Sequence, residues 1–409
     1  MKKTLVLAAI ILLVAPVLAG CASASPPQPQ PEATGYDAEA VAAARNTDFD
    51  MSFFHTVAAA DAGNNVVVSP LSLRLALAMT YNGASGTTKQ QMADVLGFAG
   101  LTDQQVNNRF NALIESLEGL GNQAQIDIAD SLWANQDYQF YPEFIQACQA
   151  SYEAEVASLD FSDPISLETI NNWVKENTKE RIDKIIDQLN PLDVLILINA
   201  LSFDGKWTES FDPSLTQPRD FYLPGGSTTQ AQMMSQSGYY NYYESGGFQA
   251  VALPYGDGKV SMYVFLPREG SDYQSFLGTL TGADWDAANF SSSPGSIQLP
   301  RFTLKYDRTL NDDLKAMGME SAFNLDASDF SAMGPDGRDF FISQVRQKDY
   351  IEVNEEGTKA AAATSVTMHA TAAPVDHFYF NADRPFFFAI VDNASSTPLF
   401  LGSVTNPGQ

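Results

Sequence analysis

The side chains that most often carry out catalysis are few and widely separated in this sequence. It contains three histidines, His55, His369 and His377. His55 lies among apolar residues of an expected helix, and no fixed carboxylate orients the other two, so a Ser-His-Asp nucleophile is poorly supported. The sequence also lacks a glycine-rich phosphate loop and a His-x-x-x-His zinc helix. We therefore expect no enzymatic activity, no cofactor and no metal site.

The segment from Asn354 to Pro374, NEEGTKAAAATSVTMHATAAP, suggests a different chemistry, that of a substrate. One parity becomes more apolar along the chain, and the other ends in polar residues. The first parity comprises Thr358, Ala360, Ala362, Thr364, Val366 and Met368. This alternation is typical of a half-buried strand, yet the segment begins with Glu-Glu-Gly and ends with Ala-Pro, as loops do. The pattern predicts a segment that is first exposed and later inserted into a sheet.

A simpler interpretation of the same residues remains open. The run from Ala360 to Ala363 favours helix formation, so the segment is also compatible with an alanine-rich linker or a short helix. Thr364, Val366 and Thr367 oppose the helix because branching at Cβ restricts their side chains. Pattern alone does not decide between these alternatives.

The hinge-like start of this segment resembles that of a known family. Glu355-Glu356-Gly357-Thr358, followed by Ala360, Ala361, Ala362 and Ala363, resembles the hinge of the serpins. Serpins trap a protease by inserting their cleaved reactive loop into a central sheet. Further blocks resemble serpin sequences in the family's order, namely NVVVSPLS (65–72), NALSFDGKW (199–207), Met233-Met234, Leu253-Pro254-Tyr255, LPRF (299–302), FNADRPFFF (380–388) and PLFLGSVTNP (398–407). The resemblance implies a serpin-like α+β fold with a large mixed central sheet, surrounding helices and an exposed reactive loop.

The resemblance also implies where a protease would cut. Serpin spacing from Gly357 places the reactive bond between Thr371 and Ala372. A slip of one or two positions would make Ala370 or Ala372 the recognised residue. No Lys or Arg lies between positions 360 and 376, so a trypsin-like enzyme has no basic side chain to bind there.

The residues near the reactive bond therefore favour a particular class of target. A small residue suits the pocket of an elastase-like or subtilisin-like serine protease. Met368 or His369 would instead suit a chymotrypsin-like enzyme or a cysteine protease if the register differs. We expect the target protease to be the partner, held in a covalent acyl complex.

The expected mechanism is that of a suicide substrate. After cleavage, Thr358 to Met368 would enter the sheet as a new strand, with Gly357 permitting the change of backbone direction. A non-inhibitory serpin, acting as a binding, storage or chaperone-like protein, is the alternative. The small residues after Thr358 favour inhibition, since non-inhibitory members tend to carry charged or bulky residues there.

Two further serpin regions have counterparts. Ser69, Ser72 and Asn199 match polar positions of the shutter, where the central sheet opens, and Gln347 stands where the family commonly has a histidine. Trp207 resembles the tryptophan of the breach, at the end of the sheet where insertion begins. Ordinary core packing is the alternative explanation for each of these residues.

The first residues are typical of a targeting signal. Lys2 and Lys3 precede a short apolar run, and Leu18-Ala19-Gly20-Cys21 resembles the prokaryotic lipobox. We expect a signal peptide over residues 1–20, a lipid on Cys21, a disordered tether over 21–45 and a single serpin domain over 46–409. The protein would then be a lipoprotein of the extracytoplasmic membrane face. A simple N-terminal membrane anchor is the alternative.

Composition limits the remaining possibilities. The formal net charge is −26, which repels nucleic acid and anionic surfaces. With Cys21 lipidated, Cys148 is expected to be a buried free thiol, and no disulfide forms. We expect a monomer that binds no nucleic acid.

Periodicity and turn residues predict the elements that must position these sites. The expected helices span Thr47–Ala60, Leu71–Tyr81, 103–118 (opened by a capping box at Thr102), Pro142–Ala150 and Ser166–Glu180. The expected strands span Gln125–Trp133, Leu192–Phe203, Val260–Leu266, Ile297–Lys305, Phe340–Val353 and Phe386–Val391. The strand at Leu192–Phe203 is apolar almost throughout, as expected for a strand covered on both faces.

Overall fold

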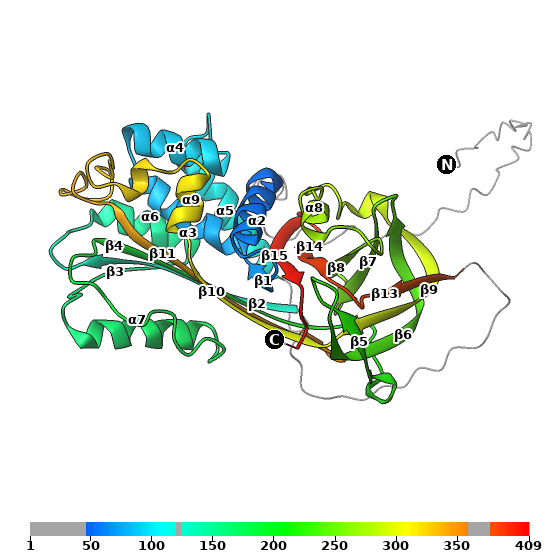
Figure 1. The fold of residues 1–409 in the computed structure, drawn as a ribbon. Helices are drawn as coiled ribbons and strands as arrows, with labels where there is room; N and C mark the ends of the chain where they lie inside the picture. Colours follow the sequence, from blue (N-terminus) through cyan, green and yellow to red (C-terminus); the bar gives the residue numbers. More distant parts are fainter. Residues whose placement is uncertain (1–45, 120–123, 359–376, 409) are drawn as a thin grey trace, which may run out of the picture. The chain divides into compact units, whose positions relative to one another are not determined.

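The computed structural model describes residues 46–119, 124–358 and 377–408. Most of its helices come from the first half of the chain (Figure 1). They are α2 (Thr47–Ala60), α3 (Pro70–Gly83), α4 (Gly86–Leu96), α5 (Asp103–Glu118), α6 (Pro142–Tyr152), α7 (Pro164–Asn177), α8 (Tyr273–Leu277) and α9 (Asn311–Ala316), with short 3-10 turns at Pro213–Leu215, Ala287–Asn289 and Ser321–Phe323.

The strands form two sheets in the described part of the chain. The larger sheet has the order β1 (Val66–Val68), β15 (Thr397–Val404), β14 (Phe386–Asp392), β8 (Val260–Pro267), β7 (Phe248–Tyr255), β6 (Thr228–Glu244), β9 (Ser291–Pro300) and β13 (Phe378–Asn381), with β5 (Gln217–Tyr222) on β6. The second sheet has the order β10 (Phe302–Thr309), β11 (Ile342–Asn354), β12 (Gly357–Thr358), β4 (Leu195–Lys206), β2 (Ala124–Asn135) and β3 (Glu155–Leu159). Both sheets mix parallel and antiparallel pairs, which confirms the predicted α+β class.

Strand β4 is covered on both faces of the second sheet. Leu197 and Leu201 contact the main hydrophobic core, whereas Ile196 and Ile198 contact a smaller core that includes α7 residues. Helix α3 packs on the first face and α7 lies along the other (Figure 1). The prediction of a doubly covered strand is therefore confirmed, although the strand begins at Leu195 rather than Leu192.

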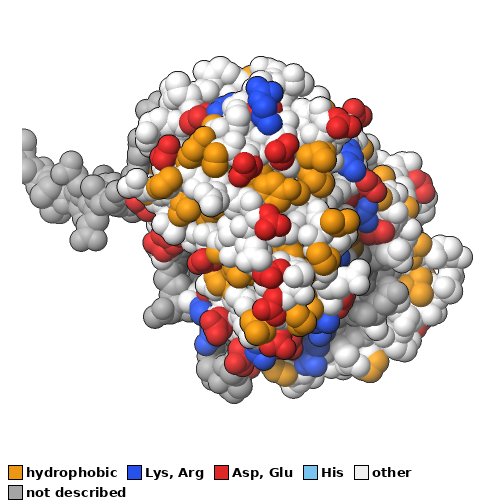
Figure 2. All heavy atoms as spheres, turned by 90° about the vertical axis from the view of Figure 1, so that its left-hand side faces the viewer, with side chains coloured by type: hydrophobic (Ala, Val, Ile, Leu, Met, Phe, Trp, Pro, Cys, Tyr) orange, Lys and Arg blue, Asp and Glu red, His pale blue; other side chains and the backbone are white. Residues whose placement is uncertain are grey.

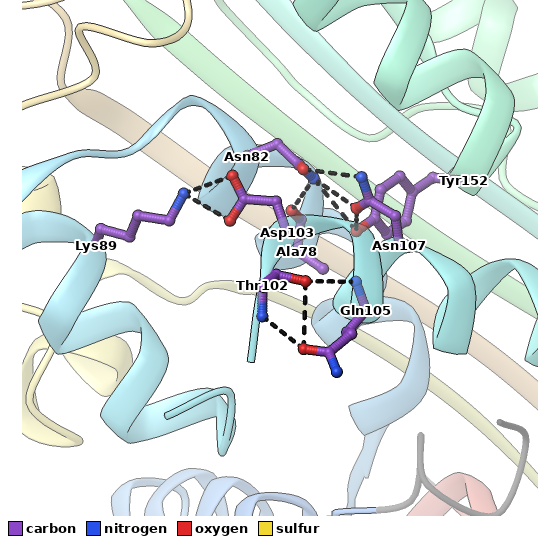
Figure 3. Close-up of polar contacts among 8 residues, drawn as sticks. All are labelled: Ala78, Asn82, Lys89, Thr102, Asp103, Gln105, Asn107 and Tyr152. Carbon is purple, nitrogen blue, oxygen red and sulfur yellow. Dashed lines mark hydrogen bonds and ion pairs between the residues drawn. The ribbon is translucent and has the colours of Figure 1, made fainter. Parts of the chain in front are cut away.

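A polar cluster fastens the helices above this sheet to one another. Asn82 of α3 exchanges amide hydrogen bonds with Asn107 of α5, and the Tyr152 hydroxyl of α6 donates to Asn107 at 2.6 Å. Figure 3 shows these side chains pointing toward one another, together with the Lys89–Asp103 ion pair. The predicted capping box at Thr102 is present, with Gln105 closing it. Helices α3, α5 and α6 are thus joined over β2 and β4.

One predicted strand is wrong. The sequence favoured a single strand over Ile297–Lys305, but β9 ends at Pro300 and β10 begins at Phe302, in different sheets. The backbone N–H of Arg301 donates to Gln232, and Pro300 has no N–H to continue a ladder. The other expected strands and helices are present, with boundaries shifted by a few residues.

Two residues with potentially reactive side chains, Cys148 and His55, lie in helices of the described structure. Cys148 is buried and free in α6, as predicted, and burial raises the pKa of its thiol to about 12. His55 lies in α2, where its Nε2 is 2.9 Å from the carbonyl oxygen of Leu277. Among the described residues, no group of three His, Cys, Asp or Glu side chains could hold a metal ion.

Two further observations concern the length and polarity of the described helices and the distribution of charge on the surface. None of those helices combines the length and the apolar character needed to cross a bilayer. Figure 2 shows acidic side chains scattered among hydrophobic and basic ones over the face that it presents.

Candidate functional site at the junction of β4, β11 and β12

Strand β12 lies between two strands that pair directly with each other elsewhere. Thr358 faces Val353 of β11 on one side and Gly205 of β4 on the other, and both pairings are antiparallel. Beyond β12, β11 and β4 form a parallel ladder that ends with Tyr350 opposite Ser202. The junction is therefore open at the end occupied by β12 and closed along the remainder.

Only glycine fits at the first position of β12. Gly357 has a φ of 149°, and an added Cβ would lie 2.0 Å from the carbonyl oxygen of Gly205. A side chain would therefore be strained and would also collide with the β4 backbone. The predicted hinge glycine is needed here for close approach to β4.

Thr358 is completely buried and held by an aromatic pair. Its hydroxyl shares a 2.7 Å hydrogen bond with the Tyr255 hydroxyl. Trp207 stacks on Tyr255 with ring centroids 4.4 Å apart, and its indole N–H donates to the carbonyl of Asn354 at 2.9 Å. Since Thr358 is already paired with both β4 and β11, the expectation that insertion begins at Thr358 is wrong; a continuing strand would begin at Lys359.

An ion pair supports the turn before β12. The Glu355 side chain is only 6% exposed and forms a salt bridge with Arg301, while the Thr216 hydroxyl donates to it at 2.5 Å. Burial would raise the pKa of Glu355, but the donors from Arg301 and Thr216 outweigh it and hold the pKa below its ordinary value. The pair borders an open pocket of about 630 Å³ that Phe302 and Pro407 also line. Glu356 is less buried and accepts a hydrogen bond from the Trp207 backbone at its carbonyl.

We call Trp207, Tyr255, Arg301, Glu355 and Thr358 the hinge cluster. These residues come from strands of both sheets, from the segments next to them and from β12 itself. Together they hold the start of the reactive segment between β4 and β11.

A second polar group spans the closed part of the junction. The side-chain amide of Asn199 in β4 donates to the Ser72 hydroxyl and to Oδ1 of Asp130 (2.6 Å). Its Oδ1 accepts a hydrogen bond from Nε2 of Gln347 in β11 at 2.6 Å. Gln347 also donates to the backbone carbonyl of Ser69 at 2.8 Å. We call these five residues the shutter network, because its Asn199–Gln347 bond must break before β4 and β11 can part.

Comparison with known families agrees with this geometry. The family model described as Serpin (serine protease inhibitor) matches residues 44–407. The chain belongs to the serpin family.

The serpin relatives are similar over most of their length. Leukocyte elastase inhibitor A of Rattus norvegicus is 32% identical over 377 residues, covering 88% of this chain and 98% of the relative. An uncharacterized serpin-like protein of Thermococcus kodakarensis is 35% identical over 351 residues, covering 84% and 81%. The crystal structure of tengpin, a thermophilic serpin in the native state, has a TM-score of 0.82 and 32% identity, covering 90% of this chain and 94% of tengpin.

The serpin structure brings most of the predicted site residues together. Ser69, Ser72, Asn199 and Gln347 lie in one network, and all four are buried. Trp207 lies against the hinge, at the end of the junction occupied by β12. Cys21, Ala360, Ala361, Ala362, Ala363, Thr371 and Ala372 lie outside the described residues. Their assigned roles stay predictions.

Sequence reasoning assigned no role to four residues of this site. Arg301 and Tyr255 fall within the serpin-like blocks that were recognised, but nothing in the blocks indicates their partners. Asp130 and Asp349 are 3% and 1% exposed. The sequence does carry a signal for Asp130, because it lies on the same parity of β2 as the apolar Ile126, Ile128 and Leu132, whereas Asp127 does not.

Proposed function

We propose that this serpin inhibits serine proteases as a suicide substrate. The protease cleaves the reactive loop, and the freed segment adds to the second sheet between β4 and β11 before the acyl bond is hydrolysed. The observation that carries the proposal is β12, a two-residue strand already paired on both sides at the end of the junction. A strand that continues from it replaces one parallel ladder with two antiparallel ones.

The register of β12 supports this insertion. Thr358 pairs with Gly205 of β4 on one side and Val353 of β11 on the other. These two residues are separated by the same number of positions in the sequence as Ser202 and Tyr350, which pair directly with each other. The two strands are thus already aligned for a strand between them. Continued in this register, the inserted segment would bring Met368 opposite Leu195, where β4 begins. The predicted insertable segment has the length that β4 can accept.

The same register gives Thr364 a defined place. It would lie opposite both Asn199 and Gln347, on the parity of the buried Thr358. Its hydroxyl can both donate and accept, so it can replace the side-chain bond that Asn199 and Gln347 lose when the strands part. Ala360 and Ala362 on the same parity are small enough to enter between packed strands.

The free-energy gain of insertion comes from the ladder and from burial. Each new ladder hydrogen bond contributes about 0.5–1.5 kcal/mol net. Val366 and Met368 would contribute about 1.5–3 kcal/mol each if fully buried. These terms favour the inserted state only after cleavage, because the intact loop is tethered at both ends.

For the target, we propose an elastase-like or subtilisin-like protease cut at Thr371–Ala372. The small residues around this bond support the assignment, as do the elastase inhibitors among the relatives. A cysteine protease remains an alternative target class for the same loop.

We also propose that the chain is a lipoprotein of the extracytoplasmic membrane face, attached through Cys21 and a tether ending near residue 45. The lipobox-like Leu-Ala-Gly-Cys supports this. Full-length protein expressed in a bacterial host should be recovered in the membrane fraction, and mass spectrometry of its N-terminal peptide should show diacylglyceryl-Cys21. Cys21→Ala should prevent lipidation; an unmodified Cys21 in the wild-type protein would refute the proposal.

Incubation with pancreatic elastase or subtilisin tests the inhibitory function. We expect a covalent complex that survives denaturing electrophoresis, and mass spectrometry of the complex gives the position of the cut. Thr358→Arg should convert the inhibitor into a substrate, because the arginine would be buried unpaired beside Tyr255. Thr228→Arg, the same change at an exposed position of β6, should leave inhibition unchanged. Clean cleavage alone with every protease class would favour a non-inhibitory binding role.

A further inference from the structure

The shutter network and the neighbouring Asp349 contain buried acceptor atoms that lack donors. Oδ2 of Asp130, Oε1 of Gln347 and both carboxyl oxygens of Asp349 are buried without a hydrogen bond of good geometry, although the Ser69 backbone lies close enough to Asp349 to lower its pKa. All three residues lie within the second sheet, and Gln347 and Asp349 share one face of β11. A buried acceptor without a donor is costly, and a proton on each carboxyl would supply the missing donors.

No cation compensates these carboxyls among the charged groups of the described neighbouring elements. Those charged side chains form ion pairs with other residues. The pairs are Arg74 of α3 with Asp50, Asp127 of β2 with Lys179 and Arg181, Arg346 and Lys348 of β11 with Asp307, and Arg308 of β10 with Asp61 and Asp313. Strand β1 is Val66–Val68, and the buried residues of α5 carry no charge. Asp130 and Asp349 are therefore the titratable groups on this face of the junction.

We propose that Asp130 and Asp349 are positioning residues of sheet opening: they hold protons while β4 and β11 are joined and release them when the strands part. Parting separates Gln347 and Asp349 from Asn199 and admits water to both carboxyls. Insertion is then easier at higher pH. This inference rests on the proposed insertion function and adds a proton dependence to it.

The direction of the pKa shifts agrees with this assignment. Burial raises the pKa of Asp130 to about 8, although hydrogen bonds from Asn199 and Ser72 oppose the shift. Burial also raises the pKa of Asp349 well above its ordinary value, against the smaller opposing effect of the Ser69 backbone. The joined sheet is thus most stable relative to the open one below the ordinary aspartate pKa of about 4. That advantage is lost as the pH rises through the folded-state values.

The closed sheet can be tested without any protease. Thermal unfolding of the intact full chain is followed from pH 5 to pH 9 for wild type and for the double variant Asp130→Asn, Asp349→Asn. Asparagine keeps an acceptor oxygen, supplies a donor and does not ionise. We expect the variant's melting temperature to rise relative to wild type with increasing pH and then to level off. The control Asp183→Asn, Asp312→Asn removes two exposed acids, at 77% and 97% exposure, and should follow wild type. A double variant that shifts equally at every pH would overturn the proposal.

Sheet opening is measured by a synthetic peptide with the sequence of residues 359–368. Its rate of incorporation into the intact protein should rise with pH in wild type, by up to about tenfold per unit for each of the two protons released, and stay flat in the double variant. Incorporation at the same rate at every pH in wild type would also overturn the proposal. A peptide that enters at no pH would count against the insertion function itself, and the unfolding profiles would still decide whether the two acids hold protons.

Discussion

The hinge cluster and the shutter network lie along the same two strands, yet they are built from different interactions. In the hinge cluster, β12 separates β4 from β11, and an ion pair and stacked aromatic rings hold it there. In the shutter network, β4 and β11 pair directly, and the side-chain amides of Asn199 and Gln347 form a hydrogen bond between them in a fully buried site. At the hinge end of the junction, β12 lies between β4 and β11, whereas at the shutter end the direct pairing of β4 with β11 leaves no space for a strand between them.

The pKa shifts of Glu355 and Asp130 predict opposite responses of the two regions to pH. The pKa of Glu355 is lowered, so its contribution is present near neutral pH and is lost as the pH falls through that lowered value. The pKa of Asp130 is raised, so its contribution is largest in acid and is lost as the pH rises toward about 8. We therefore expect the hinge cluster to stay in place and the shutter network to weaken as the pH rises. The comparison can be tested by weakening one region at a time.

The largest effect is expected from Gly357→Val. This substitution should remove β12 from between β4 and β11, so that the hinge end of the junction no longer differs from the shutter end. The side chain collides with the Gly205 carbonyl and expels β12. We expect a loss of about 3 kcal/mol in the free energy of unfolding, from strain and overpacking, measured by urea denaturation. The control Gly246→Val has no atom within 4 Å and should lose much less. Wild-type stability in Gly357→Val would mean that β12 is not held in the sheet.

Arg301→Ala should come next, at about 2 kcal/mol, because it leaves the buried Glu355 carboxylate without its cation. The figure lies below that for a fully buried pair, since Arg301 is 43% exposed. Burial then outweighs the remaining donors and raises the pKa of Glu355 above its ordinary value, so protonation of Glu355 favours the folded variant. The stability that the variant has lost relative to wild type should therefore become smaller as the pH falls, which melting curves between pH 3 and pH 7 measure. The control Arg268→Ala breaks a pair in which both partners are 44% exposed and should cost about 0.5 kcal/mol; an equal loss in both variants would contradict the role of burial.

Tyr255→Phe should cost about 1–1.5 kcal/mol, because it deprives the buried Thr358 hydroxyl of its partner while leaving the stacked ring in place. Chemical denaturation measures the loss. The exposed Tyr222 provides the comparison, since Tyr222→Phe should change the free energy by much less. If Tyr255→Phe has no effect, the hydroxyl contact does not hold the hinge.

The smallest effect is expected outside both regions. Lys89→Ala removes the ion pair with Asp103 on the helices, where the two side chains are 26% and 45% exposed. The free energy of unfolding should fall by about 0.5 kcal/mol, with no change in protease inhibition or in the pH profile. A changed pH profile in this variant would show that the opposite responses do not belong to the two regions alone.

Much of the fold followed from local patterns in the sequence. Helix α2 matches its predicted boundaries, and the capping box at Thr102 opens α5 as expected. The doubly covered β4 was evident because Leu195 to Leu201 is apolar almost throughout. These features depend on residues close together in the chain, and such residues carry enough information to define an element.

The features that the sequence did not predict depend on contacts between residues that are far apart in the chain. Nothing local marks Arg301 as the point where the chain leaves one sheet for the other, because apolar residues continue on both sides of it. The partners of Glu355 and Asp130 come from other elements, so the pattern could not show which carboxylate is paired and which is buried among neutral groups. Whether a buried carboxyl has a cation or hydrogen-bond donor beside it decides the direction of its pKa shift. A single sequence does not show which residues lie beside it.

The matched offset of β4 and β11 has a mechanical consequence. Because Thr358 faces Gly205 and Val353 at the offset that already relates Ser202 to Tyr350, the two strands need no sliding along their axes to admit a third. The sheet can divide into two groups of paired strands, β4 with β2 and β3 on one side and β11 with β10 on the other. Each group keeps its own ladders during this sideways translation, so the hydrogen bonds lost are those of a single seam.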